Sequence, residues 1–201
     1  MIEVNDVKPE LVVCDNFYNN PDDVRAMALE APFEPSDYHK GQRSLSEFYF
    51  EGVQEKFEQL LGRKITEFTM AGRFQFCTAQ DPLVIHSDCQ THAAVVFLMP
   101  DAPPQCGTNF YRRKGLNLRR LPSMEDAERF GTSVNDLIQQ VYVDNYYDQT
   151  KFDLVDSIGN IYNRVVLWDA YLIHGAAMYF GTEKQNSRLF QMFFFNCDGI
   201  T

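Results

Sequence analysis

Residues 65–78 read ITEFTMAGRFQFCT, a long run dominated by β-branched and aromatic residues, and this run decides the fold class. Such residues favour extended strands, where large side chains pack on a pleated surface. Further runs of the same kind follow at residues 92–99, 108–112, 164–168, 172–180 and 188–197. The turn signals between them, such as Cys106-Gly107 and Gly181-Thr182, favour antiparallel hairpins. From residue 65 onward, the chain therefore predicts a mainly β fold.

The part of the chain before residue 65 predicts two helices. Residues 20–23, NPDD, supply an N-cap, a proline at the first helical position and acids in the first turn. A helix to about Glu30 should follow. Between positions 53 and 61 apolar residues recur at helical spacing and stop at Gly62, which predicts the second helix. Residues 33–50 lack periodicity and predict a surface loop.

Residues 115–159 form an insert between two predicted strands. It contains a third predicted helix, capped by Ser123, and a polar, tyrosine-rich stretch at 142–147. Two interpretations fit this insert equally well: a lid over a site, or a decoration that covers a sheet edge. The chain has 201 residues, enough for one sizeable core, so we expect a single domain over 1–201 that includes the insert.

Charge and composition argue against several classes of function. The net charge of −10 repels phosphate backbones, which argues against general nucleic-acid binding. No apolar run reaches the length of about 18 residues that a membrane helix needs, and the first residues lack a signal pattern. Five cysteines without a C-x-x-C pair predict reduced thiols. We therefore expect a cytoplasmic protein without membrane association.

The tripeptide His86-Ser87-Asp88 is the first candidate for chemistry, in a chain with only four histidines. Side chains repeat with period two along a strand, so His86 and Asp88 should project from one face. A third ligand is His174, at the end of an apolar run and followed by small residues. Two histidines and one carboxylate leave coordination positions free, which suits Fe(II) that binds a chelating cosubstrate and O₂. A structural zinc site would close its shell instead.

Arg188, at the start of the last predicted strand, is the fourth candidate. A guanidinium makes a planar, two-pronged contact with a carboxylate. A dicarboxylate such as 2-oxoglutarate would need this arrangement, with its keto-acid end on iron and its distal carboxylate on the arginine. Each feature alone is weak, because H-x-D recurs by chance and a histidine in an apolar strand is usually a packed core residue. Their combination and order make a much stronger signal.

These residues resemble a known family. The pattern His86-x-Asp88, His174, Arg188, with CGTNFY at 106–111, is similar to the Fe(II)/2-oxoglutarate-dependent dioxygenases, particularly their prolyl-hydroxylase-like branch. Residues 17–24, FYNNPDDV, resemble the entry to the N-terminal helix in small bacterial and phage members. The resemblance implies a double-stranded β-helix, that is, a jelly-roll barrel flanked by N-terminal helices. It also implies hydroxylation of a substrate with release of succinate and CO₂.

Two positions depart from the family pattern. Many relatives have Ser or Thr two residues after the cosubstrate arginine, where this chain has Phe190. Many also have a tyrosine on the strand before H-x-D, where residues 73–77 read RFQFC. The remaining contacts of 2-oxoglutarate must therefore differ, while iron ligation is unaffected.

Four lesser candidates lie near these motifs. Gln75 or Arg73 is expected to line the pocket, with at least one of them pointing outward. We expect His92 to be a packed or outer-shell residue rather than a fourth ligand. Asp169 is expected to shape a turn.

Two other functions compete with the dioxygenase. A cupin-like metalloenzyme would use the same three ligands without 2-oxoglutarate and would not need Arg188. A non-catalytic jelly-roll binding module would bind no metal. The sequence leaves the substrate open, whether small molecule or peptide, because loops make the pocket and carry no transferable code. It also leaves open whether the chain oligomerises.

Overall fold

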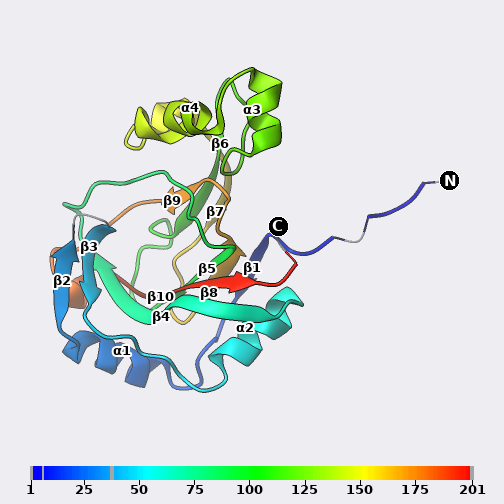
Figure 1. The fold of residues 1–201 in the computed structure, drawn as a ribbon. Coiled ribbons are helices and arrows are strands. Elements are labelled where there is room, and N and C mark those ends of the chain that lie inside the picture. Colours follow the sequence, from blue (N-terminus) through cyan, green and yellow to red (C-terminus); the bar gives the residue numbers. More distant parts are fainter. Residues whose placement is uncertain (1, 6, 37–38, 200–201) are drawn as a thin grey trace.

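The structure is a computed structural model that describes residues 2–5, 7–36 and 39–199. Two antiparallel sheets face each other, and the helices lie outside them (Figure 1). The larger sheet contains, in spatial order, β1 (Leu11–Cys14), β8 (Val165–Asp169), β5 (His92–Phe97), β10 (Arg188–Cys197), β4 (Ile65–Cys77), β3 (His39–Ser44) and β2 (Phe33–Ser36). The smaller sheet contains β7 (Phe152–Ile158), β6 (Thr108–Arg113) and β9 (His174–Ala176). The predicted mainly β fold is confirmed.

Strand β10, at the centre of the larger sheet, shows why this sheet is buried on both faces. Its side chains alternate between the two faces, as the period of a strand requires. Phe193 and Phe195 pack in the core on the helix side, whereas Phe190 and Met192 pack toward the smaller sheet. A strand buried on both faces is apolar almost throughout, which explains the sequence RLFQMFFFNC.

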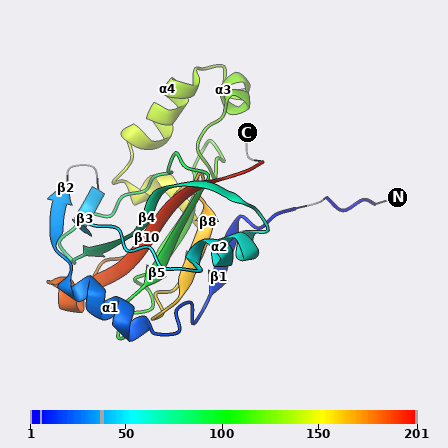
Figure 2. The ribbon, with the colours of Figure 1, turned by 60° about the horizontal axis from the view of Figure 1, so that its bottom comes forward.

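Helices α1 (Pro21–Glu30) and α2 (Val53–Leu61) cover the outer face of the larger sheet, as Figure 2 shows. Both predicted helices are confirmed, and α2 ends at Gly62 with φ 63°, the left-handed conformation that favours glycine. Phe57 of α2 is fully buried and stacks on Phe195, with ring centroids 5.5 Å apart. None of the helices in the described ranges is long and apolar enough to cross a membrane.

Residues 33–50 are not the loop that the sequence predicts. Strands β2 and β3 form an antiparallel hairpin within them and extend the larger sheet through β4. Residues 37 and 38 lie outside the described part of the chain. The prediction was wrong because an edge hairpin is held by backbone hydrogen bonds and needs no alternation of apolar side chains. The correction matters for function, since β3 contributes side chains to the site.

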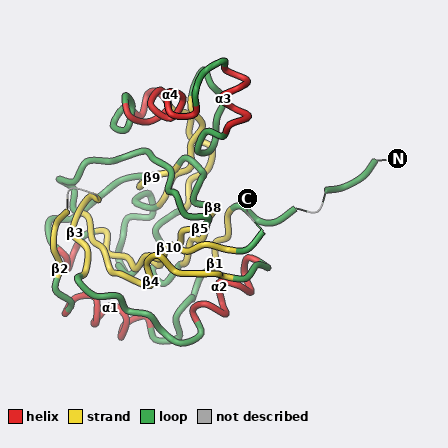
Figure 3. Tube along the Cα trace, in the orientation of Figure 1, coloured by secondary structure: helices red, strands yellow, loops and turns green. Residues whose placement is uncertain are grey.

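The insert contains more regular structure than the sequence predicts. Its third helix, α3 (Met124–Phe130), is confirmed, and Ser123 caps it by accepting a hydrogen bond from the Asp126 backbone N–H. The segment continues through α4 (Val134–Ile138), a π-helical turn at Gln139–Val143 and a 3-10 turn at Gln149–Lys151. Its last part is β7, which pairs with β6 and therefore belongs to the barrel (Figure 1), whereas α3 and α4 lie beyond the two sheets (Figure 3). We call residues 116–151 the helical segment.

The helical segment is packed firmly against the barrel. Leu137 and Val141 are fully buried in a core cluster that also contains Ile85 and Ile173. These two isoleucines directly precede His86 and His174 in the chain. The segment is thus anchored beside the loop and strand that carry the candidate ligands.

The run at 172–180 predicts a long strand, but β9 covers only His174–Ala176. The chain then leaves the sheet and reaches β10 through a 3-10 turn at Lys184–Asn186. Strand β9 is short because it pairs only with β6 and with the single bridge residue His86.

Candidate metal centre

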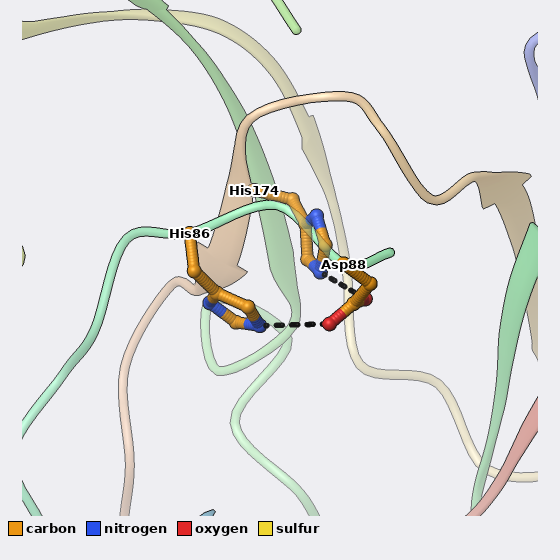
Figure 4. Close-up of side chains that lie close together, drawn as sticks. All are labelled: His86, Asp88 and His174. Carbon is orange, nitrogen blue, oxygen red and sulfur yellow. Dashed lines mark ion pairs between the residues drawn. The ribbon is translucent and has the colours of Figure 1, made fainter. Parts of the chain in front are cut away.

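Three predicted ligands converge at one end of the space between the sheets. The sequence predicts that His86 lies in a regular strand. In the structure it instead forms an isolated antiparallel bridge with His174. Each of these residues donates its backbone N–H to the carbonyl of the other, at 2.9 and 2.8 Å. The Asp88 N–H donates to the Ala170 carbonyl at 2.9 Å. These hydrogen bonds fix the backbone of all three residues, and Figure 4 shows their side chains pointing toward one another.

The ligating atoms lie close enough to share one ion. One atom from each of His86, Asp88 and His174 lies within 4.8 Å of the other two. His86 Nε2 is 3.6 Å from Asp88 Oδ1, and His174 Nε2 is 3.3 Å from Asp88 Oδ2 (Figure 4). Two histidines and one carboxylate on one side of an ion leave the other side free for exogenous ligands.

The hydrogen bonds around the three residues fit a bound cation. The Leu172 carbonyl accepts a hydrogen bond from His174 Nδ1–H at 2.8 Å, so Nε2 of the neutral ring presents a lone pair to Asp88. Asp88 Oδ2 is buried and accepts no well-aligned hydrogen bond from the described residues. Two lone-pair donors 3.3 Å apart repel each other unless a cation lies between them. The donor set therefore fits a divalent metal.

The electrostatics keep His86 and Asp88 in the form that binds metals. Burial, assisted by the neighbouring His174, lowers the pKa of His86 to about 4, so its ring is neutral near pH 7. Burial alone would raise the pKa of Asp88, but contacts with His174 and His86 and the charge of Arg43 hold it below its usual value. A neutral imidazole and an ionised carboxylate are the ligating forms.

A cavity of about 590 Å³ adjoins the three ligands and has room for a small organic molecule. Small residues after His174 keep it open, as the sequence indicates. At Gly175 any β-carbon would overlap the Val84 carbonyl oxygen, so only glycine allows the two backbones to approach this closely. This close approach supports the bridge between His86 and His174.

Arg188 lies in the same cavity and is 4% exposed. Its Nε donates to the Cys106 carbonyl at 3.1 Å, and Nη2 donates to the Gly107 carbonyl and to Thr108 Oγ1, both at 3.3 Å. Its guanidinium also lies over the ring of Phe190, 4.5 Å from the centroid. It forms no ion pair with a carboxylate of the described residues. A buried guanidinium with only neutral partners is a site for an anionic ligand.

The lesser candidates are placed as follows. Gln75 lines the cavity, whereas Arg73 does not. His92 is buried, stacks on Phe195 and contacts Thr91 Oγ1 through Nδ1, so it is a packed residue as predicted. Asp169 accepts a hydrogen bond from the Tyr171 backbone N–H at 3.0 Å, which confirms its role in a turn.

Sequence reasoning missed the side chains that reach the site from distant segments. Tyr142, in the helical segment, contacts Ser87 through its hydroxyl at 2.6 Å, and the Tyr146 carbonyl accepts from the Ile85 N–H at 3.0 Å. The tyrosine-rich stretch was the only signal for these contacts. Arg43 of β3 and Tyr179, after β9, also line the cavity, and no local pattern marks them.

The fold and the three converging ligands define a double-stranded β-helix protein with a two-histidine, one-carboxylate cluster. The family model described as a family of unknown function, DUF6445, matches residues 1–189, and the chain belongs to this family. No curated protein matches the chain.

Several solved structures share this fold. HygX from Streptomyces hygroscopicus, solved with nickel, 2-oxoglutarate and hygromycin B bound, has a TM-score of 0.57 and 12% identity over 96% of this chain and 84% of its own. A Pseudomonas putida prolyl-4-hydroxylase has a TM-score of 0.52 and 14% identity over 94% of each chain. A 2OG-Fe(II) oxygenase family oxidoreductase from Burkholderia pseudomallei has a TM-score of 0.54 and 11% identity, covering 93% and 84%. The predicted jelly-roll fold is confirmed.

Proposed function

We propose that the protein is a non-haem dioxygenase that requires Fe(II) and 2-oxoglutarate and hydroxylates its substrate with release of succinate and CO₂. His86, Asp88 and His174 would hold the iron, and Arg188 would bind the distal carboxylate of 2-oxoglutarate. The bound metal and cosubstrate would supply, with O₂, the oxidising power that attacks a C–H bond. The protein's own residues hold, orient and shield these groups.

One observation carries the proposal: the open-sided ligand cluster shares one cavity with a buried arginine that has no acidic partner among the described residues. Burying a guanidinium without a counter-charge is costly, and a bound carboxylate offsets that cost. A metal site that works without 2-oxoglutarate leaves Arg188 without a role. The fold supports the same conclusion, since HygX was solved with nickel and 2-oxoglutarate bound.

Other side chains in the cavity can replace the two family residues that this chain lacks. Thr108 and Tyr179 both line it, and both lie beside Arg188. Their hydroxyls are the groups that would complete the binding of the distal carboxylate. Burial raises the pKa of Tyr179, so its hydroxyl keeps its proton and can donate it in a hydrogen bond. Phe190 packs against the guanidinium and excludes water from it.

Thermal unfolding tests the proposal without knowledge of the substrate. Anaerobic Fe(II) should raise the melting temperature of the wild type, and 2-oxoglutarate should raise it further, because ligands that bind only the folded state stabilise it. His174→Ala should remove both increments, and Arg188→Met only the second. An iron increment without a 2-oxoglutarate increment in the wild type would establish a metalloenzyme of another kind.

We also propose that the protein acts in the cytoplasm as a single domain. All five cysteines are free thiols, which suits a reducing compartment. The helical segment shares a core cluster with the barrel, which supports one folding unit. Two of its tyrosines, Tyr146 and Tyr147, line the cavity, so a covering role over the site is proposed for it as well.

A further inference from the structure

Arg43, on β3, is a second arginine in the cavity. It lies opposite Gln75 of β4, which lies opposite Phe190 of β10, which in turn lies opposite Phe97 of β5. Residues directly opposite each other in a sheet project from the same face. Phe190 and Phe97 belong to the core between the two sheets, so this row of side chains faces the interior of the barrel. Arg43 is thus an inward-facing residue, one strand before the row ends at Glu34 of the edge strand β2.

The Arg43 guanidinium is held in position by neutral groups. Its Nε donates to Gln75 Oε1 at 2.9 Å. The Gln75 amide is itself oriented, because its Nε2 donates to the Lys40 carbonyl at 2.8 Å and leaves Oε1 to face the arginine. An oriented guanidinium loses little entropy when it binds a ligand.

The terminal nitrogens of Arg43 are not used by the described residues. No hydrogen bond or ion pair involves Nη1 or Nη2 among them. Glu34 lies opposite Arg43 on β2, yet it is exposed and forms no ion pair with it. Burial, together with the charge of Arg73, lowers the pKa of Arg43 to about 10, so it remains positively charged at neutral pH. The side chain therefore keeps one charged, two-pronged edge for a ligand.

With Fe(II) and 2-oxoglutarate bound, the positive charge of Arg43 is not needed to balance the carboxylates at the metal. Ferrous iron and Arg188 together offset the Asp88 carboxylate and the two carboxylates of 2-oxoglutarate. Arg43 then contributes one positive charge close enough to the metal site to lower the pKa of Asp88. A substrate with a single anionic group would neutralise it.

We infer that Arg43 binds a carboxylate of the substrate, and that the protein hydroxylates a small carboxylate-bearing molecule. The planar edge of a guanidinium matches a carboxylate with two parallel hydrogen bonds. The cavity volume of about 590 Å³, with Tyr146 and Tyr147 of the helical segment along one side, suits a small molecule better than a peptide. Tyr147 also accepts a hydrogen bond from Lys40 of β3 at 3.1 Å, which links the two sides of the cavity. This inference rests on the proposed function and extends it to the class of substrate.

Binding measurements on the protein loaded anaerobically with Fe(II) and 2-oxoglutarate test the inference. The probes are free amino acids, N-acetyl amino acids, and aliphatic and aryl monocarboxylic acids, each paired with its uncharged carboxamide. Calorimetry gives affinities, and the change in the visible band of the iron chelate shows binding next to the metal. At least one acid should bind, and its carboxamide should bind at least about tenfold more weakly, since a charged hydrogen bond contributes about 1.5 kcal/mol or more.

Variants locate the effect at Arg43. Arg43→Gln should remove the preference for acid over carboxamide and leave 2-oxoglutarate affinity within about twofold of the wild type. Arg43→Lys keeps the charge but not the planar edge, and should retain only part of the preference. Arg129→Gln, which removes a positive charge from exposed α3, is the matched control and should behave as the wild type.

Three results would overturn the inference: carboxamides that bind as tightly as acids, a preference that survives in Arg43→Gln, or no acid that binds the loaded protein. In each case the chelate band still forms, so the proposed function stands. Absence of the band in the wild type would instead contradict the proposed function, and the inference about the substrate would fail with it.

Discussion

Removal of the Tyr142 hydroxyl should weaken Fe(II) binding, although Tyr142 is not one of the proposed ligands. Tyr142, in the helical segment, is 3% exposed and its hydroxyl lies 2.6 Å from Ser87 Oγ. The Ser87 hydroxyl donates to the Tyr171 carbonyl at 2.8 Å, so Tyr142 is the donor of the shorter bond. Because Ser87 lies between His86 and Asp88 in the chain, this bond holds the segment that carries two of the three ligands. Tyr142→Phe removes the bond and keeps the ring.

The size of the effect follows from one buried hydrogen bond. Its loss should lower the free energy of unfolding by about 1 kcal/mol, measured by urea denaturation of the metal-free protein. Ser87→Ala leaves the Tyr142 hydroxyl without its partner, whereas the Tyr171 carbonyl still accepts from the Leu121 N–H at 2.7 Å, so the variant should cost about 2 kcal/mol. In the double variant the two losses should not add, with a coupling of about 1 kcal/mol. Fe(II) affinity, measured by anaerobic calorimetry, should fall roughly tenfold in Tyr142→Phe, as for other outer-shell contacts.

The matched control is Tyr49→Phe, at a residue that is 46% exposed and is not among the residues that line the cavity. It should change neither unfolding nor iron affinity. If Tyr142→Phe binds Fe(II) within about twofold of the wild type while its stability falls, the helical segment does not brace the ligands, and the reasoning fails.

Two further predictions concern backbone packing and pH. Gly175→Ala should lower the free energy of unfolding by about 1 to 3 kcal/mol in urea denaturation and should also weaken Fe(II) binding. The reason is that the added β-carbon would force the Val84 backbone away from β9. The control is Gly159→Ala, whose β-carbon comes no closer than 3.3 Å to any neighbour. His92 is 3% exposed, and its burial lowers its pKa to about 4. The unfolded chain therefore takes up this proton first as the pH falls below about 6.5, and the wild type should lose about 2 kcal/mol between pH 7 and 5 through this group. His92→Asn should lose correspondingly less, and an equal loss in both proteins would refute the assignment.

The sequence predicted those elements whose signals are local. Pro21 marks the start of α1, Gly62 the end of α2 and Ser123 the start of α3, and each acts on the adjacent turn of its helix. The apolar strands were found because burial on both faces makes them uniformly hydrophobic. The β2–β3 hairpin and β7 were missed, since edge strands are specified by partners far along the chain.

The same distinction applies to the site. The three candidate ligands and Arg188 could be proposed because histidine is rare in this chain and their spacing is informative. Arg43 could not, because only the cross-strand register from β3 to β10 shows that it faces the cavity. The bracing by Tyr142 depends on packing between the helical segment and Ile85, which no local pattern encodes.

The most direct test of the central claim is an anaerobic titration of the metal-free protein with Fe(II) and then 2-oxoglutarate, followed by the visible charge-transfer band of the chelate. The wild type should develop the band. Arg188→Met should need roughly 10- to 100-fold more 2-oxoglutarate, as expected for the loss of a charged, two-pronged contact, and Arg129→Met should match the wild type. An unchanged titration in Arg188→Met would contradict the assigned anchor. Iron that binds the wild type without producing a band would contradict the use of 2-oxoglutarate altogether.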